Sequence, residues 1–262
     1  MIRKGYVDGR WGQVHCREAG DGIPLVLLHQ SPLSGAMFDP AMPLLAAAGI
    51  RAIAIDTAGF GMSDSPPAPV SIADHGDALA AVLDGLGLTA PAILGHHTGA
   101  MIAASFAARY PDRVSRLVLN GVPALSDAER AHFATFRFSA LKPEADGSHL
   151  LASWNQRLAA SPGWTNLDAM HKHVVEMLAK NQTYWWGFTA AFSHDMAPDL
   201  AAIGCPTLVF TNTGEDLYES SKRVAAGRPD WRFAALEGGT HDIVDEQPEA
   251  WARVVAEFVT GA

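Results

Sequence analysis

The feature that most constrains the fold is a series of short, continuously apolar runs, each followed by a glycine-rich or polar turn. Runs of this length are typical of strands buried on both faces of a parallel sheet. Helical patterns separate several of them, and strands that alternate with helices predict right-handed βαβ units in a doubly wound sheet. The predicted strands are Pro24–His29, Arg51–Asp56, Ala92–Gly95, Arg116–Asn120, Thr207–Thr211 and Phe233–Glu237. The predicted helices are Ser71–Leu88, Gly99–Tyr110, Ser220–Ala226 and Pro248–Val259.

Two segments depart from this alternation. Near the N-terminus, Lys4–Asp8 and Gln13–Glu18 flank a turn with two glycines, which predicts an antiparallel hairpin on the sheet edge. The segment 122–200 has no strand-like run and holds four of the seven tryptophans, so we expect a helical lid over the carboxyl edge of the sheet. The predicted organisation is an α/β core of residues 1–121 and 201–262 with a helical cap of residues 122–200.

The composition excludes several classes of function. With 262 residues, of which 48% are hydrophobic and 18% charged, the chain can build one large core. A formal net charge of −9 offers no basic surface for nucleic acid. No run approaches the ~18 apolar residues of a membrane helix, and the polar start lacks the apolar stretch of a secretory signal. Cys16 and Cys205 lie far apart, which predicts reduced thiols rather than a disulfide. We expect a cytoplasmic protein that acts on a small molecule and binds neither nucleic acid nor membrane; its oligomeric state stays open.

The segment with the clearest chemistry is Gly95-His96-His97-Thr98-Gly99. A buried strand enters it and a helix leaves it, and its spacing is that of the G-x-S-x-G nucleophile elbow with histidine in place of serine. The flanking glycines suit this turn because the central residue is strained and its neighbours pack closely.

Five further segments resemble the α/β-hydrolase superfamily, and they occur in the order expected along almost the whole chain. They are the oxyanion loop with Gln30 where relatives have glycine, the D-x-x-G-x-G-x-S-D turn at Asp56–Asp64, the helix at Leu83–Leu88, the strand at Cys205–Val209, and the histidine loop at Gly238–His241 with its closing helix.

The resemblance implies a set of site residues. His241 is the expected triad base, and its acid follows the strand Thr207–Thr211. We predict Asp216 as that acid, with Glu215 as the runner-up because the loop length alone cannot place the carboxylate. The family geometry also implies an oxyanion hole formed by the backbone N–H groups of Ser31 and Thr98.

The cap supplies the predicted substrate pocket. Its aromatic cluster predicts an apolar wall, although the same aromatics would equally suit a small core within the cap. The residues assigned to this pocket are Gln30, Trp154, Tyr184, Trp185 and Trp186.

A histidine at the elbow is compatible with several functions. Neutral imidazole can attack an acyl group or act as a base, and a helix N-terminus favours its neutral form. The leading hypothesis is hydrolysis of a small, largely apolar ester, lactone or related acyl compound by His97, His241 and Asp216, without a cofactor. The alternatives are a lyase, decarboxylase or cofactor-free oxygenase on the same fold, and a catalytically silent binding protein. A metal site of His97, His241 and His194 lacks the ligand spacing of zinc motifs, so we expect no metal.

Overall fold

The computed structural model describes residues 1–133 and 135–261, and its centre is one eight-stranded sheet. The strand order is β1-β2-β4-β3-β5-β6-β7-β8. The first two strands form the predicted edge hairpin, β2 joins β4 in antiparallel fashion, and all later pairs are parallel. The bounds are β1 Arg3–Gly9, β2 Gly12–Ala19, β3 Ile23–Leu28, β4 Ile50–Ile55, β5 Ala92–His96, β6 Arg116–Asn120, β7 Thr207–Asn212 and β8 Arg232–Leu236. The doubly wound, mostly parallel sheet predicted from the apolar runs is therefore confirmed.

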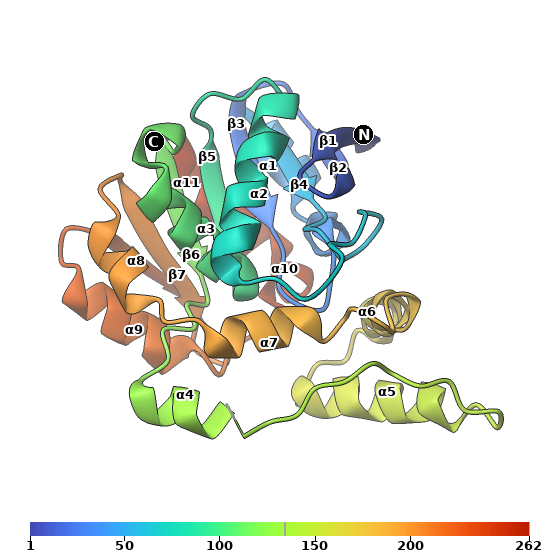
Figure 1. The fold of residues 1–262 in the computed structure, drawn as a ribbon. Coiled ribbons are helices and arrows are strands. Elements are labelled where there is room, and N and C mark those ends of the chain that lie inside the picture. The colour runs from blue at the N-terminus through green and yellow to red at the C-terminus, as the bar shows by residue number, and fades with distance from the viewer. Residues whose placement is uncertain (134, 262) are drawn as a thin grey trace.

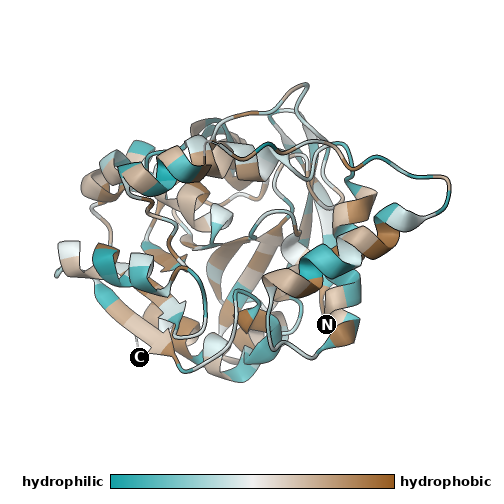
Figure 2. Ribbon diagram, turned by 90° about the horizontal axis from the view of Figure 1, so that it is seen from below, coloured by the Kyte–Doolittle hydropathy of each residue, from teal (hydrophilic) through white to brown (hydrophobic). Residues whose placement is uncertain are grey.

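Helices cover both faces of the sheet, as a parallel sheet requires. One apolar cluster packs α2 and α3 against one face, and a second packs α1 and α11 against the other. In Figure 2 the central strands are mostly brown, whereas the outer helices carry teal segments beside brown ones. The core helices are α1 Met42–Ala47, α2 Ile72–Gly85, α3 Thr98–Arg109, α9 Tyr218–Gly227, α10 Ile243–Glu246 and α11 Pro248–Thr260, with 3-10 turns η1 Gly35–Phe38 and η2 Pro111–Arg113.

The long connection between β6 and β7 is helical and forms the cap. Figure 1 shows α4 to α7 along the lower edge of the sheet, at the end where the central strands stop. A small core of its own, with Trp164, Ala169, Met170 and the partly buried Trp154, holds α5 against α6. The helices are α4 Asp127–Phe133, α5 Ser148–Ala160, α6 Leu167–Ala179, α7 Trp186–Ser193 and α8 Ala197–Ala202.

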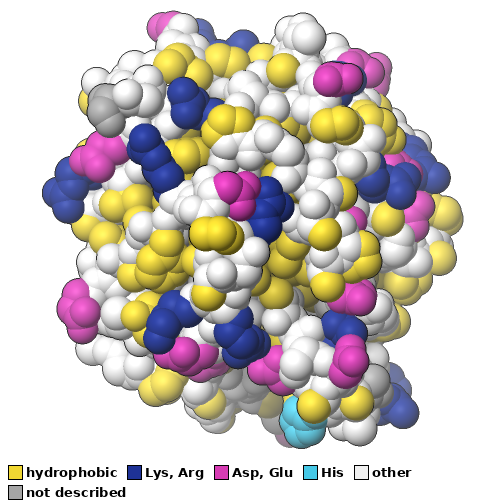
Figure 3. All heavy atoms as spheres, turned by 90° about the vertical axis from the view of Figure 1, so that its left-hand side faces the viewer, with side chains coloured by type: hydrophobic (Ala, Val, Ile, Leu, Met, Phe, Trp, Pro, Cys, Tyr) yellow, Lys and Arg dark blue, Asp and Glu magenta, His cyan; other side chains and the backbone are white. Residues whose placement is uncertain are grey.

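The surface carries charges of both signs. On the face shown in Figure 3, blue and magenta side chains are interspersed, and no continuous basic stripe is visible there. Within residues 1–133 and 135–261, no helix has the length and hydropathy to cross a bilayer.

Candidate active site

His97 occupies the turn between β5 and α3 in a conformation that no other non-glycine residue in the described chain shares. Its φ is 51° and its ψ is −110°, a strained combination for an L-residue. The flanking glycines permit the turn: a Cβ on Gly95 would lie 2.1 Å from the Gly99 carbonyl oxygen, and one on Gly99 would lie 2.1 Å from the Leu28 carbonyl oxygen. The packing reason inferred for the two glycines is therefore visible in the backbone.

The His97 ring is paired with a carboxylate. Its Nε2 lies 2.6 Å from Oε2 of Glu215, whose side chain is completely buried. An ionised carboxylate only accepts hydrogen bonds, so Nε2 carries the proton and donates it. In a neutral ring the lone pair is then on Nδ1, which has no partner among the described residues and is not among their buried unpartnered atoms. His97 and Glu215 thus form a hydrogen-bonded histidine–carboxylate dyad at the elbow.

Several groups keep Glu215 ionised. Burial alone would raise its pKa, but the hydrogen bond from His97, the attraction of the His97 and His96 rings and a hydrogen bond from the Thr211 hydroxyl outweigh burial, and the pKa lies below its ordinary value. The loop after β7 places the carboxylate. Glu215 follows Thr211 of this strand by four residues, and the hydrogen bond from the Thr211 hydroxyl ties the Glu215 side chain back to the end of the strand.

His96 supports the dyad from behind. Its ring stacks on that of His97, with centroids 4.3 Å apart and planes inclined by 8°. Its two nitrogens lie 2.9 Å from Asn120 Oδ1 and 2.9 Å from the His241 carbonyl oxygen. Burial, and then the nearby His97, lower the pKa of His96 to about 4, although both of its partners are acceptors and a neutral ring has only one N–H to donate.

His241 faces the dyad but does not have the predicted acid. The His97 and His241 ring centroids are 6.1 Å apart. Asp216 is exposed, and within the described part of the chain its carboxylate makes no hydrogen bond or ion pair with His241. The predicted His241–Asp216 pairing is therefore not formed there. The loop turns the buried Glu215 towards the elbow instead, and Glu215, the runner-up, is the acid that contacts a histidine. Burial lowers the pKa of His241 to about 4. The negative charge of the nearby Asp242 raises this pKa, but by less than burial lowers it.

One cavity of about 370 Å³ lies between the sheet edge and the cap and brings the two histidines together. His97 and His241 line it, as do Ser31, Thr98 and Asp216. The backbone N–H groups of Ser31 and Thr98 donate no hydrogen bond to another described residue, which leaves both available at the cavity wall. Apolar side chains form most of the remaining wall, among them Met101, Leu125, Phe133, Met177, Phe188 and Phe192.

The predicted pocket residues divide into two groups. Gln30 and Tyr184 line the cavity. Trp154, Trp185 and Trp186 are absent from its described wall, because Trp154 packs in the core of the cap and Trp186 lies over Gly59 of the sheet domain. From the same aromatic cluster, Phe188 and Phe192 of α7 do line the cavity.

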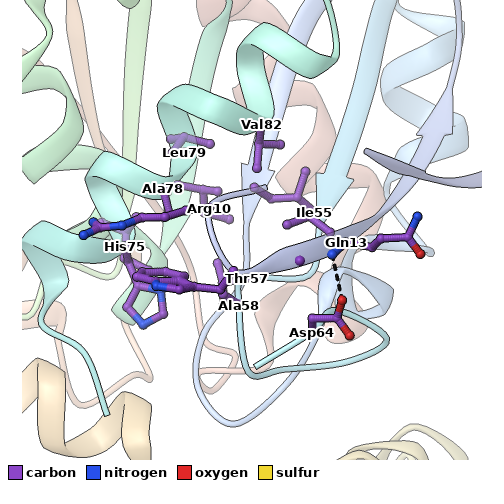
Figure 4. Close-up of a pocket in the computed structure, with 15 residues that line it drawn as sticks. Arg10, Gln13, Ile55, Thr57, Ala58, Asp64, His75, Ala78, Leu79 and Val82 are labelled. Carbon is purple, nitrogen blue, oxygen red and sulfur yellow. Dashed lines mark hydrogen bonds between the residues drawn. The ribbon is translucent and has the colours of Figure 1, made fainter. Parts of the chain in front are cut away.

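A second cavity, drawn in Figure 4, lies between the edge hairpin and α2. Its volume of about 20 Å³ suits one water molecule and no substrate. Leu79, Val82 and Ile55 form its apolar side, and the Asp64 carboxylate closes it by accepting a hydrogen bond from the Gln13 backbone N–H at 2.7 Å. The candidate site is therefore the larger cavity.

The described residues do not group His97, His241 and His194 as metal ligands. In that part of the chain, no three His, Cys, Asp or Glu side chains are grouped as metal ligands. His194, the third ligand of the alternative considered from the sequence, hydrogen-bonds with Asp199 at 2.9 Å.

The family model for the alpha/beta hydrolase fold matches residues 23–185, which is more than half of the chain. The chain belongs to the alpha/beta hydrolase fold family. The match includes the oxyanion loop, the elbow and most of the cap, so the family assignment rests on the segments that build the cavity.

Several named relatives that match nearly the whole chain are hydrolases. The chain is 29% identical to a 2-hydroxy-6-oxononadienedioate/2-hydroxy-6-oxononatrienedioate hydrolase of Pseudomonas putida, over 98% of this chain and 94% of that protein. It is 24% identical to a 2-(acetamidomethylene)succinate hydrolase of Mesorhizobium japonicum, over 94% and 91%. A thermophilic esterase from Thermogutta terrifontis, solved with malate bound, superposes with a TM-score of 0.81 at 22% identity, covering 99% and 98%.

Sequence reasoning missed the residues that surround His241. Arg157 of the cap helix α5 and Asp242 of the histidine loop form a buried ion pair, and Ser161 hydrogen-bonds with Asp242 at 2.8 Å. A buried arginine in a cap helix has no distinctive spacing, so nothing in the sequence indicated it. Asp242 follows the predicted histidine directly, which is the one signal that could have indicated it.

Proposed function

We propose that the protein hydrolyses a small, largely apolar ester, lactone or related acyl compound, with the His97–Glu215 dyad in place of a serine triad. The observation that carries this proposal is the 2.6 Å contact between His97 Nε2 and Glu215 Oε2 at the wall of the cavity. The hydrolase names of the full-length relatives support the reaction class. The apolar wall supports the substrate class.

Glu215 would orient His97 and stabilise its protonated form, the function that a carboxylate has towards a triad histidine. Nδ1 of His97 then supplies the reactive lone pair. It either takes a proton from a water that attacks the acyl carbon, or attacks that carbon itself to form an acyl-imidazole that water hydrolyses. In the first course the proton taken from water passes from His97 to the leaving alkoxide. In the second course the leaving alkoxide takes the Nε2 proton of the acylated His97, and the proton that water gives up during hydrolysis of the acyl-imidazole returns to Nε2.

The negative charge that develops on the carbonyl oxygen needs donors. The two uncommitted backbone N–H groups, of Ser31 and Thr98, border the same cavity as His97 and would supply them.

The test is a screen of aryl acetates, aryl butyrates and simple γ- and δ-lactones with the parent and with His97→Ala. Loss of a positioned base is expected to lower kcat at least 10²-fold. His171→Ala is the matched control, because His171 is exposed on α6 and outside the cavity wall. Full turnover by His97→Ala, or no activity of the parent on any acyl substrate, would contradict the proposal.

The two courses can be separated in the same samples. Rapid acid quench with an activated acyl donor, followed by mass spectrometry of the peptide with His97, detects an acyl adduct only if the imidazole itself attacks.

A further inference from the structure

The environment of His241 is dominated by one side chain of the cap. Arg157 Nη1 lies 3.1 Å from His241 Nε2, and Nη2 lies 2.6 Å and 2.5 Å from the two oxygens of Asp242. The Arg157 side chain is 9% exposed and that of Asp242 is fully buried. The cap therefore contributes a buried cation directly beside the histidine that the resemblance assigns as the base.

The four terminal hydrogens of the Arg157 guanidinium can each be assigned to an acceptor. The guanidinium is a donor only and carries four terminal N–H hydrogens. Their acceptors are Ser161 Oγ, His241 Nε2, the Asp242 carboxylate and His173 Nδ1. The other hydrogen bonds of these acceptors agree with this assignment. Ser161 donates its own hydroxyl hydrogen to Asp242, and His173 Nε2 lies 3.2 Å from the Asp245 carboxylate.

Three polar atoms lie near His241 Nε2: Arg157 Nη1 at 3.1 Å, Ser161 Oγ at 3.2 Å and Asp242 Oδ2 at 3.4 Å, and of these only the guanidinium must donate. Nε2 accepts from Arg157 and therefore holds a lone pair, so the neutral ring has its proton on Nδ1. Nδ1 has no hydrogen-bond partner among the described residues, and it is not one of the buried atoms there that lack a partner. The His241 ring lines the cavity.

We propose that Arg157 holds His241 as the neutral Nδ1–H tautomer, so that His241 donates a hydrogen bond to the substrate instead of acting as a base. Arg157 is then a positioning residue contributed by the cap. The inference for catalysis rests on the proposed hydrolysis, whereas the tautomer of His241 does not.

The proposal gives the two histidines opposite tasks. His97 has its proton on Nε2 and a lone pair on Nδ1, and His241 has the reverse. A base and a neutral donor with ring centroids 6.1 Å apart can both contact one acyl group that lies against them in the cavity. Depression of the pKa of His241 by burial keeps the ring from gaining a second proton near neutral pH.

The tautomer can be measured without a substrate. In protein labelled with ¹⁵N-histidine, long-range ¹H–¹⁵N correlation at pH 7.5 distinguishes the two nitrogens of each ring, and loss of one set of signals in His241→Asn assigns His241. We expect protonated Nδ1 and unprotonated Nε2. An Nε2–H tautomer in the parent would overturn the proposal even if the protein is an active hydrolase.

Arg157→Met tests whether the arginine sets the tautomer. We expect the His241 signals to move towards the average of the two tautomers when this donor is lost. A fixed Nδ1–H ring in a folded Arg157→Met variant would overturn the positioning role. If the variant does not fold, the measurement on the parent protein still decides the tautomer.

Kinetics distinguish a donor from a base. The amide nitrogen of asparagine can take the place of His Nδ1, whereas that of glutamine reaches the place of Nε2, and neither amide is a base. We expect His241→Asn to stay within about tenfold of the parent kcat, and His241→Gln and His241→Ala to lose about 10²- to 10³-fold, the usual effect of removing one such donor. Equal losses in all three variants would overturn the donor role. Because the comparison is made within one active series, a failure of the hydrolysis screen remains a separate result.

Discussion

Replacement of Glu215 by glutamine tests the dyad most directly. The change keeps the size of a side chain that is completely buried and removes only its charge. In the transition state His97 becomes an imidazolium, and Glu215 Oε2 lies 2.6 Å from its Nε2. With an effective dielectric constant of about 20, unit charges about 4 Å apart attract each other by roughly 4 kcal/mol. Loss of this attraction corresponds to roughly a thousandfold in rate.

A second effect acts in the same direction. If the new amide turns its N–H towards His97, Nε2 has to accept and the proton moves to Nδ1, which removes the reactive lone pair. The corresponding change of carboxylate to amide in a serine-protease triad costs roughly 10⁴-fold for this reason. We therefore expect kcat of Glu215→Gln to fall by about 10³- to 10⁴-fold.

The assay is hydrolysis of the best ester found in the substrate screen, with kcat and KM measured separately. Glu219→Gln is the matched control, since Glu219 is an exposed carboxylate of α9 that pairs only with Lys222 among the described residues. Circular dichroism and the thermal midpoint report whether the fold is intact. A folded Glu215→Gln variant within tenfold of the parent kcat would refute the dyad.

Three further predictions concern the surroundings of the dyad. Thr211→Val removes the hydroxyl that donates to Glu215, and we expect kcat to fall about 10- to 100-fold, as for other hydrogen bonds to charged groups; Thr211→Ser should restore most of it. In Gly121→Ala the new Cβ would lie 2.4 Å from His97 Nε2 at a φ of +61°, so we expect loss of both activity and stability, and an unchanged urea midpoint would contradict this packing. Three histidines, His75, His96 and His241, have a pKa that burial lowers to about 4. The unfolded chain binds protons on them from about pH 6.5 downwards, so the free energy of unfolding should fall as the pH drops from about 6.5 to 4, by roughly 3–4 kcal/mol per pH unit near pH 5. Urea midpoints measured at pH 7 and 5 would show this loss, and equal midpoints would contradict it.

The sequence by itself determined the architecture of the core. Continuous apolar runs predicted the buried parallel strands. Each predicted strand end lies within one residue of the end in the structure. The elbow could be predicted because its glycines are required locally, by contacts of 2.1 Å with neighbouring backbone. The short helix α1, Met42–Ala47, was missed, since six residues do not establish a helical period.

The assignment of charged partners was decided by the tertiary structure alone. Asp216 and Glu215 are adjacent in sequence, and only the path of the loop after β7 directs Glu215 to His97 and leaves Asp216 at the surface. Arg157 is separated from His241 by 84 residues, and the packing of the cap on the sheet domain brings the two together. Local physics selects strands, helices and tight turns, because these depend on neighbouring residues. Which ring nitrogen carries a proton depends on contacts between distant segments, and no local pattern records them.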